Sequence, residues 1–203
     1  MGKIIGINQR ISVTLIDLAL RAVFDGVYTK EYARTLAEGE FQGENRLKKT
    51  VRELGKLVER NPLLPILKEH KDKILEALQY KGDKAVIIAA IYNSAFPFSY
   101  EEVSILGKFF HVQDQVSRNL LSNKLSEIYG FNKAMSNAID YSIPTLVEAG
   151  FILRPANGLY EKNKLDLSCE ISSTVYTESF FINNPLLSRN SSYEDAPYFE
   201  FLK

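Results

Sequence analysis

The chain has 203 residues, of which 45% are apolar and 25% are charged, and its 25 basic and 25 acidic residues cancel. This composition predicts a globular protein with one large or two small domains, and it excludes a disordered or fibrous chain. The apolar runs are too short for a membrane-spanning helix or a secretory signal, and the one cysteine, Cys169, excludes an internal disulfide. We therefore expect a cytoplasmic protein that does not contact a membrane.

The charges are unevenly distributed along the chain. Residues 165–203 contain six acidic and two basic side chains, so the first 164 residues carry an excess of four positive charges. A net charge of zero argues against a nucleic-acid partner, but this excess allows a modest basic patch.

Residues 1–62 are predicted to form a trihelical, helix-turn-helix-like domain. A first helix is expected at 12–24, a short second helix follows Thr29 as its cap, and a long third helix runs from about residue 44 to the Asn61-Pro62 pair. Outside its apolar stripe the third helix carries Lys48, Lys49, Arg52, Lys56 and Arg60. This basic face either contacts DNA or is an ordinary solvated surface on which Glu53 and Glu59 pair with their neighbours.

A helical connector is predicted at 63–82, and it ends at Lys81-Gly82-Asp83. A second domain, 83–168, then begins with an apolar helix that Asp83 caps and Pro97 ends. Helices follow at 99–110, with Ser99 as the cap, and at 113–129. A fourth helix begins near residue 132, and its interior Pro144 is expected to kink or split it.

The fourth helix passes directly into a β-hairpin. Met135, Ile139, Ile143 and Leu146 share one helical face, and Gly150 can close the helix in the left-handed conformation. Strand residues then flank residues 155–158, which contain the strong turn signal Asn-Gly. This order is typical of the third helix and wing of a winged helix-turn-helix domain. The predicted fold is therefore mainly α, with two helical (winged) helix-turn-helix-like domains and a small C-terminal β-hairpin.

The last segment, 169–203, is richer in Ser, Asn, Tyr and Phe than the rest of the chain. Residues 171–182 are predicted to form a strand pair or an irregular segment, and the pairs Asn184-Pro185 and Ala196-Pro197 break any regular element. The aromatic end of the chain is expected to dock on the protein's own body, because its rings would be unfavourable in water; alternatively it binds a second protein.

Few residues suggest catalysis or a cofactor. The only histidines are His70 and His111, and neither has a Cys, Asp or Glu at metal-ligand spacing. No glycine-rich phosphate loop occurs, and Glu101-Glu102 fits the acidic first turn of a helix better than a catalytic carboxylate pair. We therefore expect no enzymatic activity, metal, cofactor or small-molecule substrate.

The residue types of the last helix and hairpin favour DNA binding. Opposite the buried face of the helix are Lys133, Asn137 and Tyr141, which can reach phosphates and base edges, although Asp140 and Glu148 work against an approach to DNA. The hairpin carries Arg154, Asn157, Lys162, Asn163 and Lys164, a group suited to the DNA backbone or the minor groove. Alternatively, this is an ordinary solvated hairpin.

The order of the elements also resembles a known family. The helix at 12–24, the sequence ENRLKKTVRELGKLVERNPLL from Glu44 and the later segment SIPTLVEAGFI resemble the small BrxA proteins of bacterial BREX phage-defence systems, over residues 10–160. The resemblance implies two winged or helix-turn-helix-like domains that bind double-stranded DNA, without enzymatic activity, in a multi-protein defence complex. Asn45, Arg46 and Thr50 are the polar positions to which this expectation is carried over. The aromatic tail does not match the family.

Together these features predict a double-stranded DNA-binding protein of low sequence specificity. Lys48, Lys49, Arg52 and Lys56 of the first domain and Arg154, Lys162 and Lys164 of the second are expected to neutralise phosphates at neighbouring sites on one duplex. A rival hypothesis is a protein–protein adaptor of a defence or regulatory complex, which grips its partner with the winged domain and the aromatic tail 193–201. A third, a repressor with a specific operator, requires a dimer, for which the sequence has no obvious coiled-coil seam.

Overall fold

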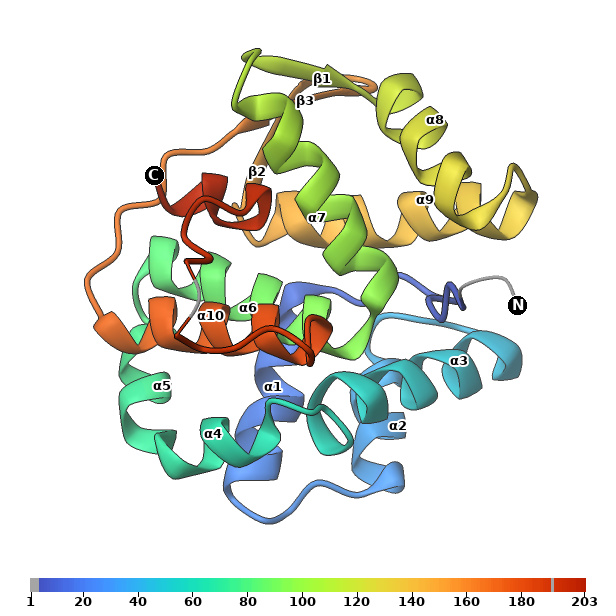
Figure 1. Ribbon diagram of the computed structural model, residues 1–203. Coiled ribbons are helices and arrows are strands. Elements are labelled where there is room, and N and C mark those ends of the chain that lie inside the picture. Colours follow the sequence, from blue (N-terminus) through green and yellow to red (C-terminus); the bar gives the residue numbers. More distant parts are fainter. Residues whose placement is uncertain (1–3, 191) are drawn as a thin grey trace.

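The molecule is mainly helical, with one small antiparallel sheet at one end (Figure 1). The computed structural model describes residues 4–190 and 192–203. The helices are α1 Val13–Phe24, α2 Lys30–Glu38, α3 Glu44–Leu54 with its π-helical extension η1 Gly55–Glu59, α4 Leu64–Glu69, α5 Lys71–Ala77, α6 Lys81–Ala95, α7 Pro97–Phe110, α8 Arg118–Tyr129, α9 Lys133–Glu148, α10 Glu170–Asn183 and the 3-10 helix η2 Pro197–Leu202. The strands are β1 Gln115–Ser117, β2 Ile152–Ala156 and β3 Leu159–Lys162. No helix in the described ranges combines the length and the apolar character that crossing a bilayer requires.

The predicted starts of the first helices are confirmed. The Ser12 hydroxyl accepts a hydrogen bond from the Leu15 N–H at 3.2 Å, and the Thr29 hydroxyl accepts one from the Tyr32 N–H at 3.0 Å. Side-chain oxygens therefore cap both α1 and α2. The long third helix is also confirmed, and its last turn, η1, widens to the π-helical form.

The connector between the two halves differs from its prediction in two ways. It consists of two short helices, α4 and α5, because His70 has φ −110° and ψ 30° and interrupts the helical path. The break predicted at Lys81-Gly82-Asp83 is wrong, because α6 begins at Lys81. Gly82 is needed there for a close approach, since a Cβ on this residue would lie 2.2 Å from the Asp166 carbonyl oxygen.

Asp83 caps a distant helix instead of its own. The prediction that it caps the helix that follows it is wrong, because Asp83 lies inside the first turn of α6 and is fully buried. Its carboxylate accepts hydrogen bonds from the Ser168 N–H at 2.9 Å, the Cys169 N–H at 3.0 Å and the Ser172 hydroxyl at 2.7 Å. Asp83 therefore holds the N-terminus of α10 against α6.

Residues 171–182 belong to helix α10, so the prediction of a strand pair or an irregular segment is wrong. The segment contains β-branched and aromatic residues such as Ile171, Val175 and Tyr176, which favour strands when only local preference is considered. In the structure these side chains are buried, and α10 packs along α6. Tertiary packing thus overrides the local preference.

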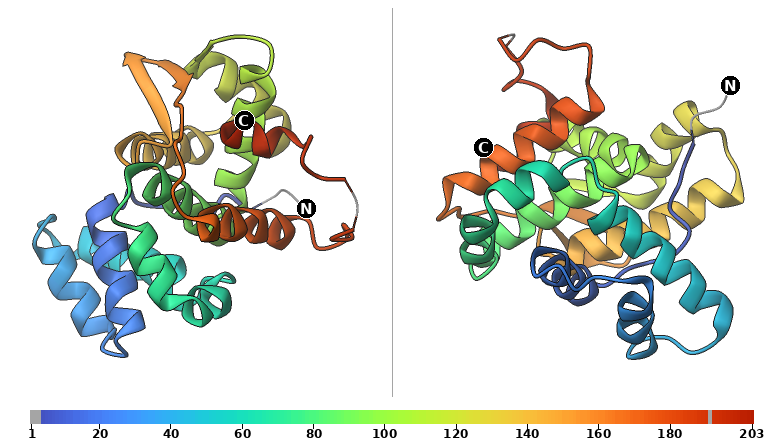
Figure 2. Two further views of the ribbon diagram at one scale, coloured as in Figure 1. Left: turned by 90° about the vertical axis from the view of Figure 1, so that its left-hand side faces the viewer. Right: turned by 90° about the horizontal axis from the view of Figure 1, so that it is seen from below.

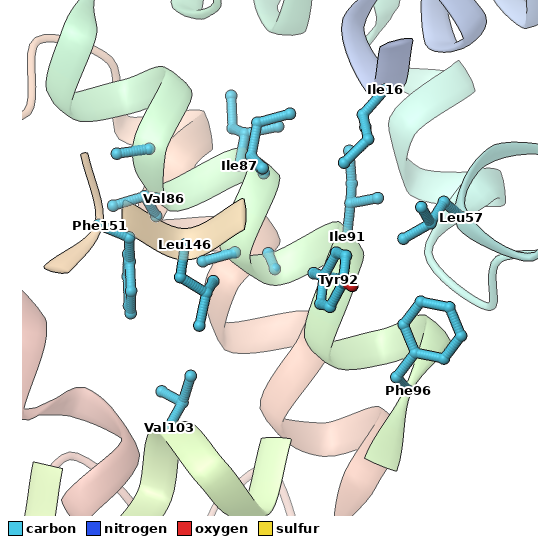
Figure 3. Close-up of a cluster of buried hydrophobic side chains, with 14 of the residues drawn as sticks. Ile16, Leu57, Val86, Ile87, Ile91, Tyr92, Phe96, Val103, Leu146 and Phe151 are labelled. Atoms are coloured by element: carbon cyan, nitrogen blue, oxygen red, sulfur yellow. The ribbon is translucent and has the colours of Figure 1, made fainter. Parts of the chain in front are cut away.

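Helix α6 is the centre of the hydrophobic core, as its apolar residues predict. Figure 3 shows its side chains among residues from both halves of the chain. Ile16 and Leu57 come from the N-terminal half, and Leu146 and Phe151 come from the C-terminal half. The two halves therefore share one continuous core.

The elements after α6 follow the order α7, β1, α8, α9, β2, β3, and the antiparallel sheet has the strand order β1-β3-β2. The predicted helix 113–129 is wrong at its start, because residues 115–117 form β1 and pair with β3. The Ser117 hydroxyl caps the true start of α8. Helix α7 begins at Pro97, not after Ser99, whose buried hydroxyl donates to Asn93 Oδ1 at 2.7 Å.

The predicted passage from helix to hairpin is confirmed. Helix α9 ends at Glu148, Gly150 has φ +79°, and the Asn157-Gly158 turn joins β2 to β3. Pro144 does not split α9, because the apolar face of this helix is buried along its whole length. β2 is an edge strand, which tolerates Pro155.

The segment before α1 runs between the two halves of the molecule (Figure 1). The Lys56 ammonium group of η1 donates to the Gly6 carbonyl at 2.8 Å, and the Thr145 hydroxyl of α9 donates to the Ile11 carbonyl at 2.8 Å. This segment therefore binds both halves through its main chain.

The C-terminal residues dock on the body, as predicted. Tyr198, Phe199 and Phe201 are buried, and the Tyr198 ring stacks on Tyr176 of α10 with centroids 4.3 Å apart. In the left view of Figure 2, α10 lies on the side opposite α1 and α2, and the C-terminal end of the tail lies beside the sheet. The buried rings are not a free surface, which corrects the contact that the adaptor hypothesis assigns to them.

Gly107 of α7 allows the tail to approach closely. A Cβ here would lie 1.9 Å from the Pro197 carbonyl oxygen, so Gly107→Ala should destabilise the protein by about 2 kcal/mol despite the better helix propensity of alanine. Urea unfolding followed by circular dichroism measures this loss. Gly39→Ala is the matched control, because Gly39 has φ −68° and its added Cβ would meet the Leu36 carbonyl oxygen at 3.3 Å. Equal stability of the two variants would contradict the packing argument.

Candidate nucleic-acid interface

A hollow of about 600 Å³ lies between α8 and α9, which meet at the right of Figure 1. No carboxylate of the described residues lines it, whereas four other hollows each include at least one Asp or Glu. The lining residues are Arg118, Asn119, Ser122 and Asn123 of α8, Phe131 and Asn132 of the turn, and Lys133, Met135 and Ser136 of α9. Cations, amides and hydroxyls are the groups that bind phosphates and base edges.

Two helix caps position this hollow. The Ser117 hydroxyl accepts from the Leu120 N–H at 3.1 Å and fixes the start of α8. Asn132 accepts from the Met135 N–H at 3.0 Å through its side-chain oxygen and fixes the start of α9. Between the helices, Gly130 has φ +76°, a conformation that favours glycine. The polar groups therefore sit on ordered backbone.

The Arg118 guanidinium group neutralises the acid expected to repel DNA. It lies 2.7 Å from the Asp140 carboxylate and donates to the Ser136 hydroxyl at 3.1 Å. The backbone N–H of Arg118 also donates to the Gly158 carbonyl at 2.8 Å, so the tip of the hairpin is fastened to the start of α8. Hollow and hairpin thus form one surface.

The predicted site residues of α9 differ in how accessible they are. Lys133 is exposed beside the hollow, and Asn137 is half-buried one turn later. Tyr141 packs half-buried against the hydrophobic core, so its ring is held to the body. Glu148 binds Arg10 at 2.8 Å, at the far end of the helix from the hollow. The first two turns of α9 are therefore the part available to a ligand.

Lys162 of β3, which is predicted to contact a phosphate, pairs with a carboxylate of the chain itself. Its ammonium group donates to Glu200 Oε1 at 2.8 Å, and its side chain is only 32% exposed. Burial would raise the pKa of Glu200, but the hydrogen bonds from Lys162 and His111 hold that pKa below its usual range. This ion pair fastens the tail to the sheet.

The other predicted hairpin residues remain accessible. Arg154 and Asn157 are exposed and hydrogen-bonded to each other. Lys164 is 90% exposed, with its ammonium group 3.8 Å from the exposed Asp166 carboxylate. Asn163, in contrast, donates to the Gly150 carbonyl at 2.6 Å and supports the hairpin.

The outer face of α3 is a second candidate surface. Asn45, Arg46 and Lys49 are exposed, and Lys48 is exposed with its ammonium group 3.5 Å from the Glu44 carboxylate. Thr50, the third polar position of the family resemblance, is buried. The resemblance therefore leaves Asn45 and Arg46 as positions that a ligand can reach.

Lys56, which is predicted to contact DNA, is bonded to groups of the chain itself. Its ammonium group donates to the fully buried Glu53 at 3.1 Å and to the Gly6 carbonyl. The Arg52 Nε also lies 3.2 Å from Glu53, but about half of the Arg52 side chain stays exposed. Glu53 is therefore a structural anchor and not part of a solvated face.

Sequence reasoning missed the contribution of α8. Arg118, Asn119 and Asn123 lie in the predicted helix 113–129, in which no site residue is predicted from the sequence. The Asn119 and Asn123 pair, spaced by one helical turn, and the Ser117 cap are the signals that could have shown a polar face.

No protein-family model, curated protein or solved structure matches this chain. Its function has to be inferred from its own residues.

Proposed function

We propose that this chain is a non-enzymatic protein that binds double-stranded DNA, mainly through phosphates and with low sequence specificity. The observation that supports it best is the α8–α9 hollow, where Lys133 and the Asp140-paired Arg118 lie with amide and hydroxyl side chains and without a carboxylate among the lining residues described. Such a surface attracts a polyanion, and its neutral polar groups can bond to phosphates and base edges.

We propose further that α7 to β3 form a winged helix-turn-helix. The element order and the strand order β1-β3-β2 support this assignment, in which the β2–β3 hairpin is the wing. Helix α9 would then enter the major groove with its first two turns, which carry Lys133, Ser136 and Asn137.

The cations available for phosphates lie on several elements. Lys133 of α9, Arg154 of β2 and Lys164 after β3 belong to the second half, and Arg46, Lys48, Lys49 and Arg52 of α3 belong to the first. Lys56 and Lys162 are excluded from this set because each is paired with a buried carboxylate and only 31% or 32% exposed. The remaining cations are enough for several phosphate contacts on one duplex.

The resemblance to the BrxA proteins supports phage defence as the setting, with other defence-system proteins as further partners. The adaptor alternative needs a surface other than the buried tail.

A duplex titration at two salt concentrations tests DNA binding. Neutralising about six phosphates gives a slope near −5 in log affinity against log salt, so affinity should fall about a thousandfold between roughly 50 and 200 mM salt. The double variant Lys133→Ala, Arg154→Ala should reduce the slope by about 2 while changing stability by less than about 0.5 kcal/mol.

Lys68→Ala, Lys73→Ala is the matched control, because it removes the same charge from exposed positions of α4 and α5. This control should bind like the wild type. Absence of binding at low salt, or an affinity that does not respond to salt, would disprove the proposal.

A further inference from the structure

An exposed aromatic ring borders the candidate interface. Phe131, in the turn between α8 and α9, is 84% exposed and lines the hollow. The turn is held on both sides, because the Gly130 N–H bonds to the Ser126 carbonyl at 2.9 Å and Asn132 caps α9. Little backbone ordering is therefore needed when this ring binds a ligand.

The surroundings of Phe131 indicate the class of ligand. The hollow beside it offers Arg118, Lys133 and several amides, and its one other apolar residue, Met135, is buried. A protein partner would call for a contiguous apolar patch. A single ring beside cations and amides instead suits a nucleic acid, whose bases stack on aromatic side chains while its phosphates meet the cations.

The gain in affinity from base stacking, compared with the cost of unstacking, decides which form of DNA the hollow prefers. Stacking one base on an aromatic ring strengthens binding by roughly ten- to hundredfold. Inserting a ring into an intact base step requires unstacking, which weakens binding by a similar or larger factor. A base that is already unpaired avoids this loss.

We propose that Phe131 stacks on an unpaired base, so that the α8–α9 hollow prefers duplex DNA with a bulge, a gap or a single-stranded end over continuous duplex. This inference rests on the proposed function, because the cations of the same hollow supply the contacts with the backbone.

The test compares two duplexes of the same sequence, one with a single bulged 2-aminopurine and one in which that base is paired. The full chain should bind the bulged duplex about tenfold more tightly, with quenching of the 2-aminopurine fluorescence. Phe131→Ala should abolish the preference and the quenching, and Phe131→Trp should retain both. Leu186→Ala is the control, because Leu186 is another exposed apolar residue and lies after α10.

Equal affinity of the wild type for the two duplexes, or a preference that survives Phe131→Ala, overturns the inference. In either case binding to the paired duplex leaves the proposed function in place. Absence of binding to both duplexes removes the proposed function and the inference together.

Discussion

Replacing Asp83 by alanine should lower the free energy of unfolding by about 4.5 kcal/mol or more, because hydrogen bonds to a charged group contribute about 1.5–3 kcal/mol each and three donors lose their acceptor. The donors are the Ser168 and Cys169 N–H groups and the Ser172 hydroxyl, all at the N-terminus of α10. Without Asp83, that terminus is left in a partly buried place with unpaired donors. Urea unfolding measures the loss, and amide hydrogen exchange should show it first in α10.

Two further variants make the Asp83 result specific. Asp83→Asn keeps one acceptor oxygen and should lose about half as much stability. Asp166→Ala removes a carboxylate that is 86% exposed and should change stability by less than about 0.5 kcal/mol. If Asp83→Ala were no less stable than Asp166→Ala, the anchoring role would be wrong.

The second large effect is a gain in stability on replacing Glu102 of α7 by glutamine. Glu102 is fully buried, and neither of its carboxyl oxygens has a hydrogen-bond partner among the described residues. Burial raises the pKa of Glu102 to about 8, and the nearby Ser142 hydroxyl and Arg118 guanidinium offset this only in part. At neutral pH the folded chain therefore holds a protonated carboxyl group, which glutamine imitates in shape and charge.

The pH dependence follows from proton binding. The folded chain keeps the Glu102 proton up to about pH 8, whereas the unfolded chain loses it near the ordinary pKa of 4.5. The folded state binds more protons between these values, so this group makes stability fall by about 3 kcal/mol as pH rises from about 5 to 8. Glu102→Gln should remove this fall and be about 3 kcal/mol more stable than the wild type at pH 8, with little difference at pH 5.

Chemical denaturation at the two pH values checks the Glu102 prediction. Glu127→Gln is the control, because Glu127 is 62% exposed and pairs only with Lys124 among the described residues, so its pH response should match the wild type. A Glu102→Gln variant that loses as much stability as the wild type between the two pH values would falsify the argument.

The features predicted correctly from sequence are those that depend on near neighbours. Thr29 could be recognised as a cap because a cap binds an N–H group three residues further along the chain. The Asn157-Gly158 turn and the Gly150 stop are likewise local, since each depends on the backbone freedom of one or two residues.

The features missed depend on partners far away in the chain. Lys162 looked like a free cation of a hairpin because its partner, Glu200, lies 38 residues later, and Asp83 looked like a local cap because its donors lie 85 to 89 residues later. In the candidate site, too, the part that was missed depends on residues that are distant in the chain. Lys133 and Arg154 could be proposed from residue type, but the hollow needed α8, whose place beside α9 is set by tertiary packing.

The segment before α1 bears on how the protein would cover DNA under the proposed function. Its main chain is held at one end by Lys56 and at the other by Thr145, so it ties η1 to α9. A duplex that contacted both the outer face of α3 and the α8–α9 hollow would therefore meet them at a fixed distance from each other. The number of base pairs protected would then be set by the dimensions of the protein.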